Sequence, residues 1–177
     1  LKTIIGNKQG RDYIDTIGHN AQRRLLLVNQ ILDERKIDKK QMRLHCSQTE
    51  MVTYIKRTVK SFKYRAEKRN IKLSVDSRIN SLVLWIDRIH FDKVIANLLS
   101  NAFKYTPDDG EITIIVDCDG KNGIIEVTDN GIGLKEEKTD RLFERFYQSK
   151  SAREMGKEGT GIGLNLVFFI GILFLIG

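Results

Sequence analysis

Residues 92–107 read DKVIANLLSNAFKYTP, and the interpretation of the whole chain depends on this stretch. Apolar side chains recur here at intervals of three and four residues, which predicts an amphipathic α-helix. The apolar stripe consists of Phe91, Val94, Ile95, Leu98 and Ala102. A second stripe, a quarter-turn away at roughly 100° per residue, consists of Asn97, Asn101, Lys104 and Tyr105. We therefore expect a helix that buries one side and presents two amides, an ammonium group and a phenol along its edge.

The second stripe has the chemistry of a site for a metal-bound phosphate. The carboxamide oxygens of Asn97 and Asn101 are neutral ligands of the kind that suit a Mg²⁺ ion with bound waters and phosphate oxygens. Lys104 can meet a phosphate as a point charge. The alternative interpretation is a solvated helix side that happens to hold two asparagines, although asparagine is a mediocre helix former. The stripe alone leaves both interpretations open.

The composition indicates one full domain with an appendage, or one large domain. The chain has 177 residues, 41% of them hydrophobic, and a net charge of +7. This charge is uneven, because residues 1–75 carry +11 and residues 76–177 carry −4. No aromatic-interleaved basic patch or recognisable nucleic-acid motif accompanies the basic part, so we expect no nucleic-acid binding by this chain. A solvated helix surface or a docking surface for an acidic protein is favoured instead.

Cysteine usage and targeting signals favour a cytoplasmic location. Cys46 and Cys118 form no CxxC pair, as is common in a reducing compartment. No signal peptide opens the chain, so we expect membrane attachment only through upstream segments outside residues 1–177. Residues 162–177 are strongly apolar but fall short of the ~20 residues that a spanning helix needs. We predict that they form part of the core, with a membrane segment as the alternative.

The periodicity of the rest predicts an α/β fold preceded by a long helix. Residues 11–35 show a single apolar seam, which calls for a partner helix or a second chain. Its members are Ile14, Ile17, Ala21, Leu25, Val28 and Leu32. We then expect a short strand at 42–46, a helix at 50–68, strands at 71–75 and 82–86, and a hairpin of 111–117 with 123–128. This order predicts a two-layer α/β sandwich, with one layer of sheet under helices.

Two glycine-rich stretches and an aromatic pair follow the hairpin. Residues 129–134 read DNGIGL, where Asp129 can accept a hydrogen bond from an exocyclic amine and Gly131 and Gly133 allow close approach of a flat ligand. Phe143 and Phe146 are spaced as on one helical face. Residues 149–158 are polar and predict a mobile lid. Residues 159–164 read GTGIGL, a turn that opens a helix and offers N–H groups to phosphates. The alternative for residues 129–131 is a plain turn, and the alternative for residues 141–148 is a short helix that packs in the core.

The order of these stretches resembles the ATP-binding domain of sensor histidine kinases, in the gyrase, chaperone, kinase and mismatch-repair ATPase superfamily. NLLSNAFKYT, DNGIGL, LFERFY and GTGIGL are similar to its N, G1, F and G2 boxes. The resemblance covers roughly residues 42–167, and residues 11–35 resemble the second helix of the kinase dimerisation hairpin. The amino-acid sequence of these stretches is similar to that of hybrid sensor kinases of Bacteroides type. The resemblance thus implies a partial helical hairpin at 1–38, a catalytic domain with a mixed sheet at 39–177, and histidine kinase activity.

The resemblance also implies cofactors, partners and residue roles. The cofactors would be ATP and Mg²⁺, with Asn97 and Asn101 as metal ligands. The partners would be the receiver domain of a response regulator and a second copy of the chain, joined through the hairpin. The implied nucleotide-binding residues are Asn97, Asn101, Lys104, Tyr105, Asp129, Gly131, Gly133, Phe143, Phe146, Thr160, Gly161, Gly163 and Leu164.

Two features depart from the family pattern. The acceptor histidine of the family precedes an acidic residue and, a few positions on, a proline, but His19, His45 and His90 precede Asn20, Cys46 and Phe91. We therefore expect the acceptor helix to lie outside this chain, which would bind ATP without labelling itself. The second departure is the end of the chain, where we expect the apolar run after Gly171 not to continue a helix. We therefore expect the C-terminal end of the catalytic domain to be atypical or truncated.

Two other functions remain as alternatives to a kinase. Relatives that hydrolyse ATP place a glutamate one turn before the metal-binding asparagine, as a base for water. This chain has Asn97 one turn before Asn101, and Lys93 one turn before Asn97, and neither is a carboxylate base. A kinase is therefore favoured over an ATP-hydrolysing conformational switch. A nucleotide-binding pseudokinase is the other alternative.

Overall fold

The computed structural model describes residues 42–133, 141–148 and 160–176, and separate positions between residues 10 and 39. The chain divides into two compact units, Leu1–Met42 and Arg43–Gly177. In the first unit, every described position from Gly10 to Lys36 is helical. Its large apolar side chains are exposed: Tyr13, Ile14, Ile17, Leu25, Val28, Ile31 and Leu32. The apolar seam predicted for this helix is therefore an open surface wherever the structure describes it.

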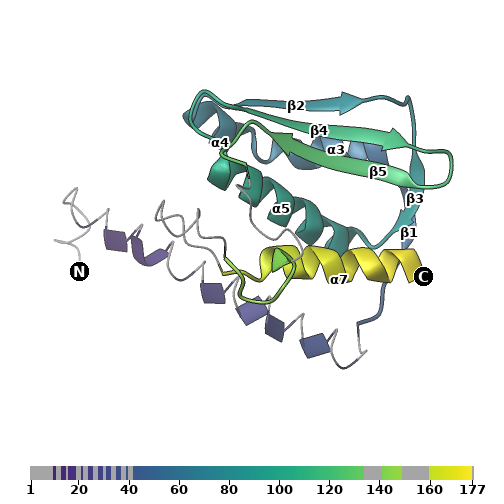
Figure 1. Cartoon of the computed structure of the whole chain (residues 1–177), viewed down its shortest axis with the longest axis horizontal. Helices are drawn as coiled ribbons and strands as arrows, with labels where there is room; N and C mark the ends of the chain where they lie inside the picture. The colour runs from purple at the N-terminus through teal and green to yellow at the C-terminus, as the bar shows by residue number, and fades with distance from the viewer. Residues whose placement is uncertain are drawn as a thin grey trace. The chain divides into compact units, whose positions relative to one another are not determined.

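The second unit contains five strands and four helices within the described residues (Figure 1). In chain order they are β1 (Ser47–Glu50), α3 (Met51–Lys60), α4 (Lys63–Lys68), β2 (Lys72–Ser77), β3 (Val83–Ile86), α5 (Arg88–Tyr105), β4 (Glu111–Cys118), β5 (Gly123–Asp129) and α7 (Gly163–Ile176). β4 is central in a three-stranded sheet, parallel to β2 and antiparallel to β5. β1 and β3 form a separate antiparallel pair. The predicted α/β class, mixed sheet and hairpin are confirmed, but the strands lie in two sheets rather than one.

The start of the second unit differs from the sequence prediction. The strand predicted at residues 42–46 is wrong, because the strand is Ser47–Glu50, which pairs with β3. The backbone N–H of His45 instead donates to Asp87 Oδ2 at 2.8 Å. The single helix predicted at 50–68 is also wrong, since the chain turns between α3 and α4. There Ser61 Oγ donates to the carbonyl of Thr58 at 2.7 Å and ends α3.

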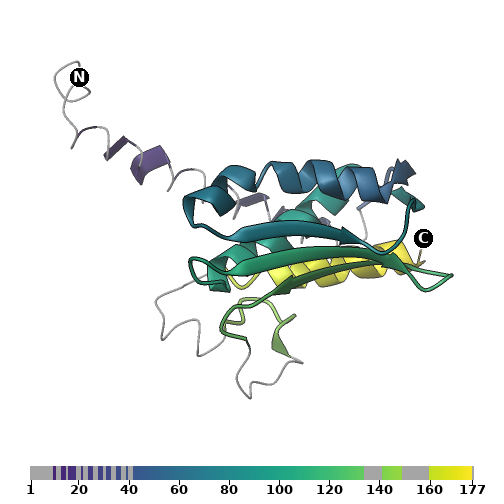
Figure 2. The same ribbon diagram turned by 90° about the horizontal axis from the view of Figure 1, so that it is seen from above.

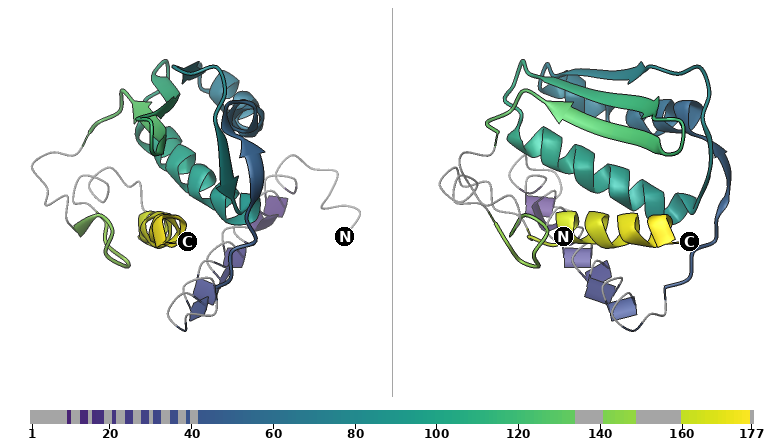
Figure 3. Two further views of the ribbon diagram at one scale, coloured as in Figure 1. Left: turned by 90° about the vertical axis from the view of Figure 1, so that its right-hand side faces the viewer. Right: turned by 45° about the vertical axis from the view of Figure 1, so that its right-hand side comes forward.

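Helix α5 is covered on two sides. Its fully buried side chains are Ile95, Leu99, Ala102 and Phe103. They pack in one core with α3 and with Ile112, Ile114 and Val116 of β4. The predicted stripe is therefore partly wrong, because Val94 and Leu98 are only half-buried while Leu99 and Phe103 are fully buried. α7 runs alongside another side of α5 (Figures 2 and 3). Because α5 is covered on two sides, a single apolar stripe does not describe its burial.

Helix α7 corrects the prediction for the end of the chain. It runs without interruption from Gly163 to Ile176, through Gly171 and the apolar run. Ile162, Leu166 and Ile170 recur every four residues and are fully buried, as expected for an apolar segment that packs against protein. The contact with α5 therefore outweighs the low helix propensity of one glycine. Among the described residues, no helix combines the length and apolar character that a membrane span requires.

Candidate functional site

Asn97 lies beside the N-terminal end of α7. Its Nδ2 atom donates to the carbonyl of Lys93 at 2.9 Å, which leaves Oδ1 on the side of Gly163. A Cβ atom built on Gly163, the first residue of α7, would lie only 2.9 Å from Asn97 Oδ1. The first N–H groups of a helix are free donors at its positive end. The structure thus brings an amide oxygen to a helix end that favours anions.

Asp129 and Gly131 lie beside the other end of α5. A Cβ atom on Gly131 would approach the carbonyl oxygen of Tyr105 to 2.7 Å, so a glycine is needed for this contact. The backbone N–H of Gly131 donates to Asp129 Oδ1 at 2.9 Å. Asp129 pairs with the buried Ile112 in the sheet register, which places it on the helix-facing side of β5. The carboxylate is exposed there and can meet a ligand.

The half-buried side chains of Asn101 and Lys104 belong to the turns of α5 between these two contacts. Asn97 and Tyr105 are separated by roughly 12 Å of helix axis, at 1.5 Å per residue. Lys104 Nζ lies 4.9 Å from the centre of the Tyr105 ring. One edge of α5 therefore joins an anion-favouring end to a carboxylate-bearing end, which suits an elongated ligand with a phosphate group at one end.

Arg69 supports the C-terminal end of α5, a role that no pattern in the sequence indicated. Its guanidinium donates to the carbonyl of Phe103, to the carbonyl of Thr106 at 2.8 Å and to Asp108 Oδ1 at 2.7 Å. These carbonyls have no partner within the helix, and a cation is favourable at this end. Asn130 fixes the neighbouring strand end, where its Oδ1 accepts the N–H of Glu111 at 2.8 Å. All four bonds join residues far apart in the chain, so periodicity could not find them.

The aromatic pair lies beside the start of α7 rather than beside Asp129. Phe146 is 63% exposed, has a φ of 61° and donates its N–H to the carbonyl of Gly161 at 3.0 Å. The ring centre of Phe143 lies 5.4 Å from that of Phe168 in α7. Thr160 Oγ1 accepts the N–H of Ile162 at 3.3 Å, and Leu164 is half-buried in the first turn of α7. The structure thus groups Phe143, Phe146, Thr160, Gly161, Gly163 and Leu164.

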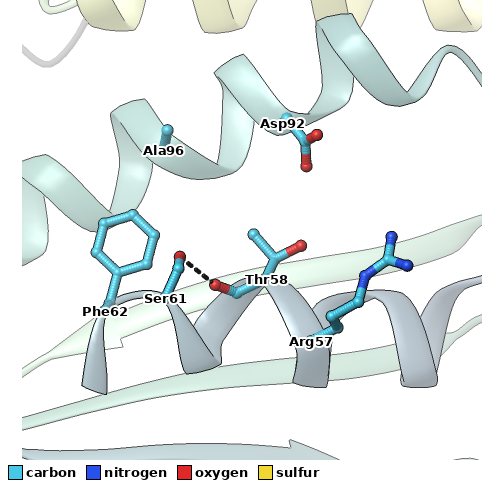
Figure 4. A pocket seen from close by; sticks show the side chains of 6 residues that line it. All are labelled: Arg57, Thr58, Ser61, Phe62, Asp92 and Ala96. Carbon is cyan, nitrogen blue, oxygen red and sulfur yellow. Dashed lines mark hydrogen bonds between the residues drawn. The ribbon is translucent and has the colours of Figure 1, made fainter. Parts of the chain in front are cut away.

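Two cavities touch the elements of this site. One, of 370 Å³, opens between α3 and α5 and is lined by Arg57, Thr58, Ser61, Phe62, Asp92 and Ala96 (Figure 4). Asp92 and Ala96 are about 140° around the helix from Asn97 and Asn101, so this cavity is not the predicted site. The other, of 220 Å³, is lined by Glu111, Thr113, Thr128, Asp129 and Asn130. Asn97 and Asn101 line neither cavity. The groups of the predicted site are therefore brought together by contacts along α5 and not by one enclosed pocket.

Some sequence predictions fall on residues that the structure does not describe. These are the lid at 149–158, Leu134 and Gly159. Gly133 is described; it is exposed and has a φ of 64°, a backbone conformation that favours glycine. In the described ranges, no group of three or more His, Cys, Asp or Glu side chains could hold a metal ion. A metal at this site would therefore need amide oxygens and ligand atoms.

The family model of the histidine kinase-, DNA gyrase B- and HSP90-like ATPases matches residues 86–169. This part of the chain belongs to that ATPase family. The match spans α5, β4, β5 and the start of α7, and it includes every residue of the predicted site. The resemblance to the ATP-binding domain of sensor histidine kinases is thus confirmed at the level of the ATPase family.

Curated relatives of this ATPase domain include histidine kinases. Histidine kinase P4 of Formosa agariphila is 31% identical over 153 residues, which are 85% of this chain and 11% of that protein. The sensor histidine kinase TmoS of Ectopseudomonas mendocina is 31% identical over 173 residues, which are 94% of this chain and 18% of that protein. The chain thus spans less than a fifth of the length of either relative, and it is similar to the ATP-binding catalytic domain of these kinases.

Solved structures with the same fold include a histidine kinase, ThkA. Full-length ShkA in complex with AMPPNP has a TM-score of 0.77 at 21% identity, over 93% of this chain and 34% of that chain. The kinase ThkA in complex with the response regulator protein TrrA has a TM-score of 0.66 at 21% identity, over 84% of this chain and 44% of that chain. These likenesses show that the ATPase domain has the histidine kinase fold.

Proposed function

We propose that residues 43–177 bind ATP with Mg²⁺ and transfer its γ-phosphoryl group to a histidine. One observation carries this proposal: α5 is in contact with the start of α7 at Asn97 and with the turn after β5 at Tyr105. Three groups that are distant in the sequence thus share one helix edge. Phosphoryl transfer depends mainly on positioning and charge neutralisation, which such an arrangement can supply.

The adenine end of the nucleotide is assigned to Asp129. Its carboxylate would accept a hydrogen bond from the exocyclic amine, and the bond from the N–H of Gly131 holds Oδ1 in place for this role. Gly131 and Gly133 would allow the flat base to approach the backbone. Tyr105 would contact the nucleoside, because its carbonyl already touches Gly131.

The phosphate end is assigned to the contact between Asn97 and α7. The N–H groups of Thr160, Gly161, Gly163 and Leu164 would bind phosphate oxygens, and Lys104 would add a positive charge. The residues fit a Mg²⁺ ion by their chemistry, because Asn97 and Asn101 offer neutral amide oxygens and Asn97 Oδ1 lies on the side of Gly163, the first residue of α7. Asn97 and Asn101 would hold the ion, which neutralises charge on the phosphates. Phe143 and Phe146 would cover this end from the segment beside α7.

Transfer to a side chain is favoured over transfer to water. A base for water would stand one turn before the metal-binding asparagine, where α5 has Lys93 and Asn97. The Lys93 carbonyl already accepts the Asn97 amide, and Asn97 cannot take a proton. The site can thus orient ATP while leaving water without a base.

The acceptor histidine is proposed to lie on the first helix of a helical hairpin. This helix would lie outside residues 1–177, and residues 1–38 would form the second helix. His90 is in the first turn of α5, with Nδ1 3.0 Å from the buried carboxylate of Asp87. His45 donates its backbone N–H to the same carboxylate. Both histidines thus belong to the framework at the start of α5, away from Asn97.

The partners follow from the same proposal. Two copies would pair through the exposed seam of the first unit, and the receiver domain of a response regulator would take the phosphoryl group from the histidine. ThkA was solved with such a regulator protein, TrrA. We further propose a cytoplasmic location, since both ATP and the regulator are found there.

The direct test is calorimetry of ATP binding with and without Mg²⁺. We expect binding in both cases and tighter binding with Mg²⁺. A separate acceptor hairpin and [γ-³²P]ATP would then test transfer, and we expect label on the hairpin histidine. Binding without transfer to any hairpin would indicate a pseudokinase, release of phosphate to water would indicate an ATPase, and no binding would overturn the proposal.

A further inference from the structure

Asn165 ties the aromatic segment 141–148 to helix α7. The side chain lies in the first turn of α7, is only 5% exposed and donates Nδ2 to the carbonyl of Phe143 at 2.6 Å. A carbonyl can only accept, so the NH₂ group of the amide must face it, and this fixes the orientation of the carboxamide. Asn165 is not among the residues predicted to bind the nucleotide.

Two more contacts hold the same segment. The Phe143 ring lies beside the ring of Phe168, one turn after Asn165, and Phe146 donates its N–H to Gly161. Gly161 has a φ of 67°, and a Cβ atom on it would lie 2.5 Å from the carbonyl carbon of Phe146. The segment is therefore joined to residues 161–168 by an amide bond, a ring contact and a backbone bond.

The amide is an unusual choice for a buried position. Asn165 Oδ1 is buried and has no hydrogen-bond partner among the described residues. An apolar side chain would fill the same place without an unsatisfied acceptor, so packing alone does not explain an asparagine. The hydrogen bond to the Phe143 carbonyl needs a donor, and Asn165 Nδ2 supplies the donor that an apolar side chain lacks.

Asn165 also lies close to the phosphate end of the proposed site. It is two residues after Gly163, whose backbone abuts Asn97, and both belong to the first turn of α7. A displacement of segment 141–148 would therefore act on the turn that faces the phosphates. The adenine end, at Asp129 and Tyr105, makes no hydrogen bond to Asn165 among the described residues and is held separately through Gly131.

We propose that Asn165 is a positioning residue that sets segment 141–148 against the first turn of α7 and thereby the affinity for the phosphates of the nucleotide. The proposal rests on the proposed function. It predicts a defect that depends on the number of phosphates, because the adenine contacts lie elsewhere.

The test is Asn165→Asp, which keeps the shape of the side chain but replaces the donor by a carboxylate oxygen. Calorimetry or competition titration would give the dissociation constants of ATP and AMP. We expect ATP to bind about tenfold more weakly, because the hydrogen bond to the Phe143 carbonyl is lost and the new carboxylate repels that carbonyl oxygen. We expect AMP to bind as before. A merely structural role would weaken both nucleotides equally and lower the melting temperature.

A matched control is Asn122→Asp, since Asn122 Nδ2 donates to Asp119 in the exposed turn between β4 and β5. This variant should bind both nucleotides as the parent chain does. Should Asn165→Asp fail to fold, Phe168→Leu removes the ring contact at an exposed position. We expect Phe168→Leu to weaken ATP more than AMP. Where Asn165→Asp does fold, the two substitutions together should show less than the product of their separate effects.

The outcomes separate this inference from the proposed function. If the parent chain does not bind ATP, the proposed function fails. If the parent chain binds ATP and both variants bind it equally well, or lose ATP and AMP alike, the role of Asn165 is overturned. Loss of ATP affinity alone supports it.

Discussion

The carboxamide of Asn97 and the backbone of Gly163 are in contact, although they belong to helices that are far apart in the chain. A side chain at position 163 would make the amide of Asn97 or the end of α7 shift. The contact sets the distance between α5 and the positive end of α7. The proposed phosphate site depends on this distance, so it is the first place to test.

Gly163→Ala should weaken ATP binding about tenfold or more. The added Cβ would lie 2.9 Å from Asn97 Oδ1, so the amide or the helix end must shift. Calorimetry with Mg²⁺–ATP checks this. Gly18→Ala is the matched control, because Gly18 is helical and a Cβ there meets nothing within 4 Å. Equal affinity for Gly163→Ala and the parent chain would remove this contact from the site.

Asp129→Asn should lose most of the affinity for ATP and keep the fold. The carboxylate is exposed, so the protein loses little stability, while the ligand loses a charge-assisted hydrogen bond worth about 1.5–3 kcal/mol. Calorimetry and thermal unfolding together check both parts. Asp76→Asn in β2, also exposed, should leave binding unchanged. An Asp129→Asn protein that binds as tightly as the parent would contradict the adenine role.

Arg69→Met should destabilise the second unit by about 2 kcal/mol. The substitution leaves the carbonyls of Phe103 and Thr106 without their charged donor at the end of α5. Urea unfolding checks the change. Lys68→Met, at the exposed neighbouring position, is the control and should change the free energy of unfolding by less than about 0.5 kcal/mol. Similar effects of the two substitutions would show that Arg69 does not support α5.

Stability should fall at acid pH through Glu50. Hydrogen bonds, those from Thr53 first, lower the pKa of Glu50 from 4.5 to about 2. Because the folded pKa lies below the unfolded one, this stabilisation is present above about pH 4.5 and is lost as the pH falls towards 2. Glu50→Gln should cost about 1 kcal/mol at pH 7, a value reduced for solvent screening. Urea unfolding from pH 2 to 7 checks this, and a difference that persists at pH 2 would argue against it.

Protonation of Asp87 should also lower the stability of the protein at acid pH. Burial would raise the pKa of its carboxyl group, but hydrogen bonds from His45 and His90 outweigh burial and lower it. Protonation at acid pH would therefore weaken the cap of α5 and its bond to His45. The acid transition of the parent chain should remain in Glu50→Gln, with a smaller slope.

The first unit should pair in solution through its exposed seam. Leu25 and Val28 are exposed apolar residues on this seam. Sedimentation of the parent chain should give a concentration-dependent mass, and Leu25→Glu with Val28→Glu should shift it towards the monomer. Arg24→Glu is the control for added negative charge, because Arg24 is exposed beside the seam. A parent chain that stays monomeric at all concentrations would exclude this surface for dimers.

The sequence by itself determined the local features of the site. Helical spacing placed Asn97, Asn101 and Lys104 on one helix, since a periodic pattern reports which residues share a face. The strand end at Asp129 and the glycines after it followed from alternation and turn residues. The order of these stretches was enough to indicate the ATPase family, which the family model confirms.

Only the tertiary structure decided which of these features touch. Asn97 meets Gly163, Gly131 meets Tyr105, and Arg69 closes the end of α5, all through pairs that are far apart in the chain. The same holds for the burial of Leu99 and Phe103 and for the continuous helix through Gly171, since packing against a second helix overrides local propensity. Periodicity describes one element at a time, whereas a site on one edge of α5 is a property of several elements packed together.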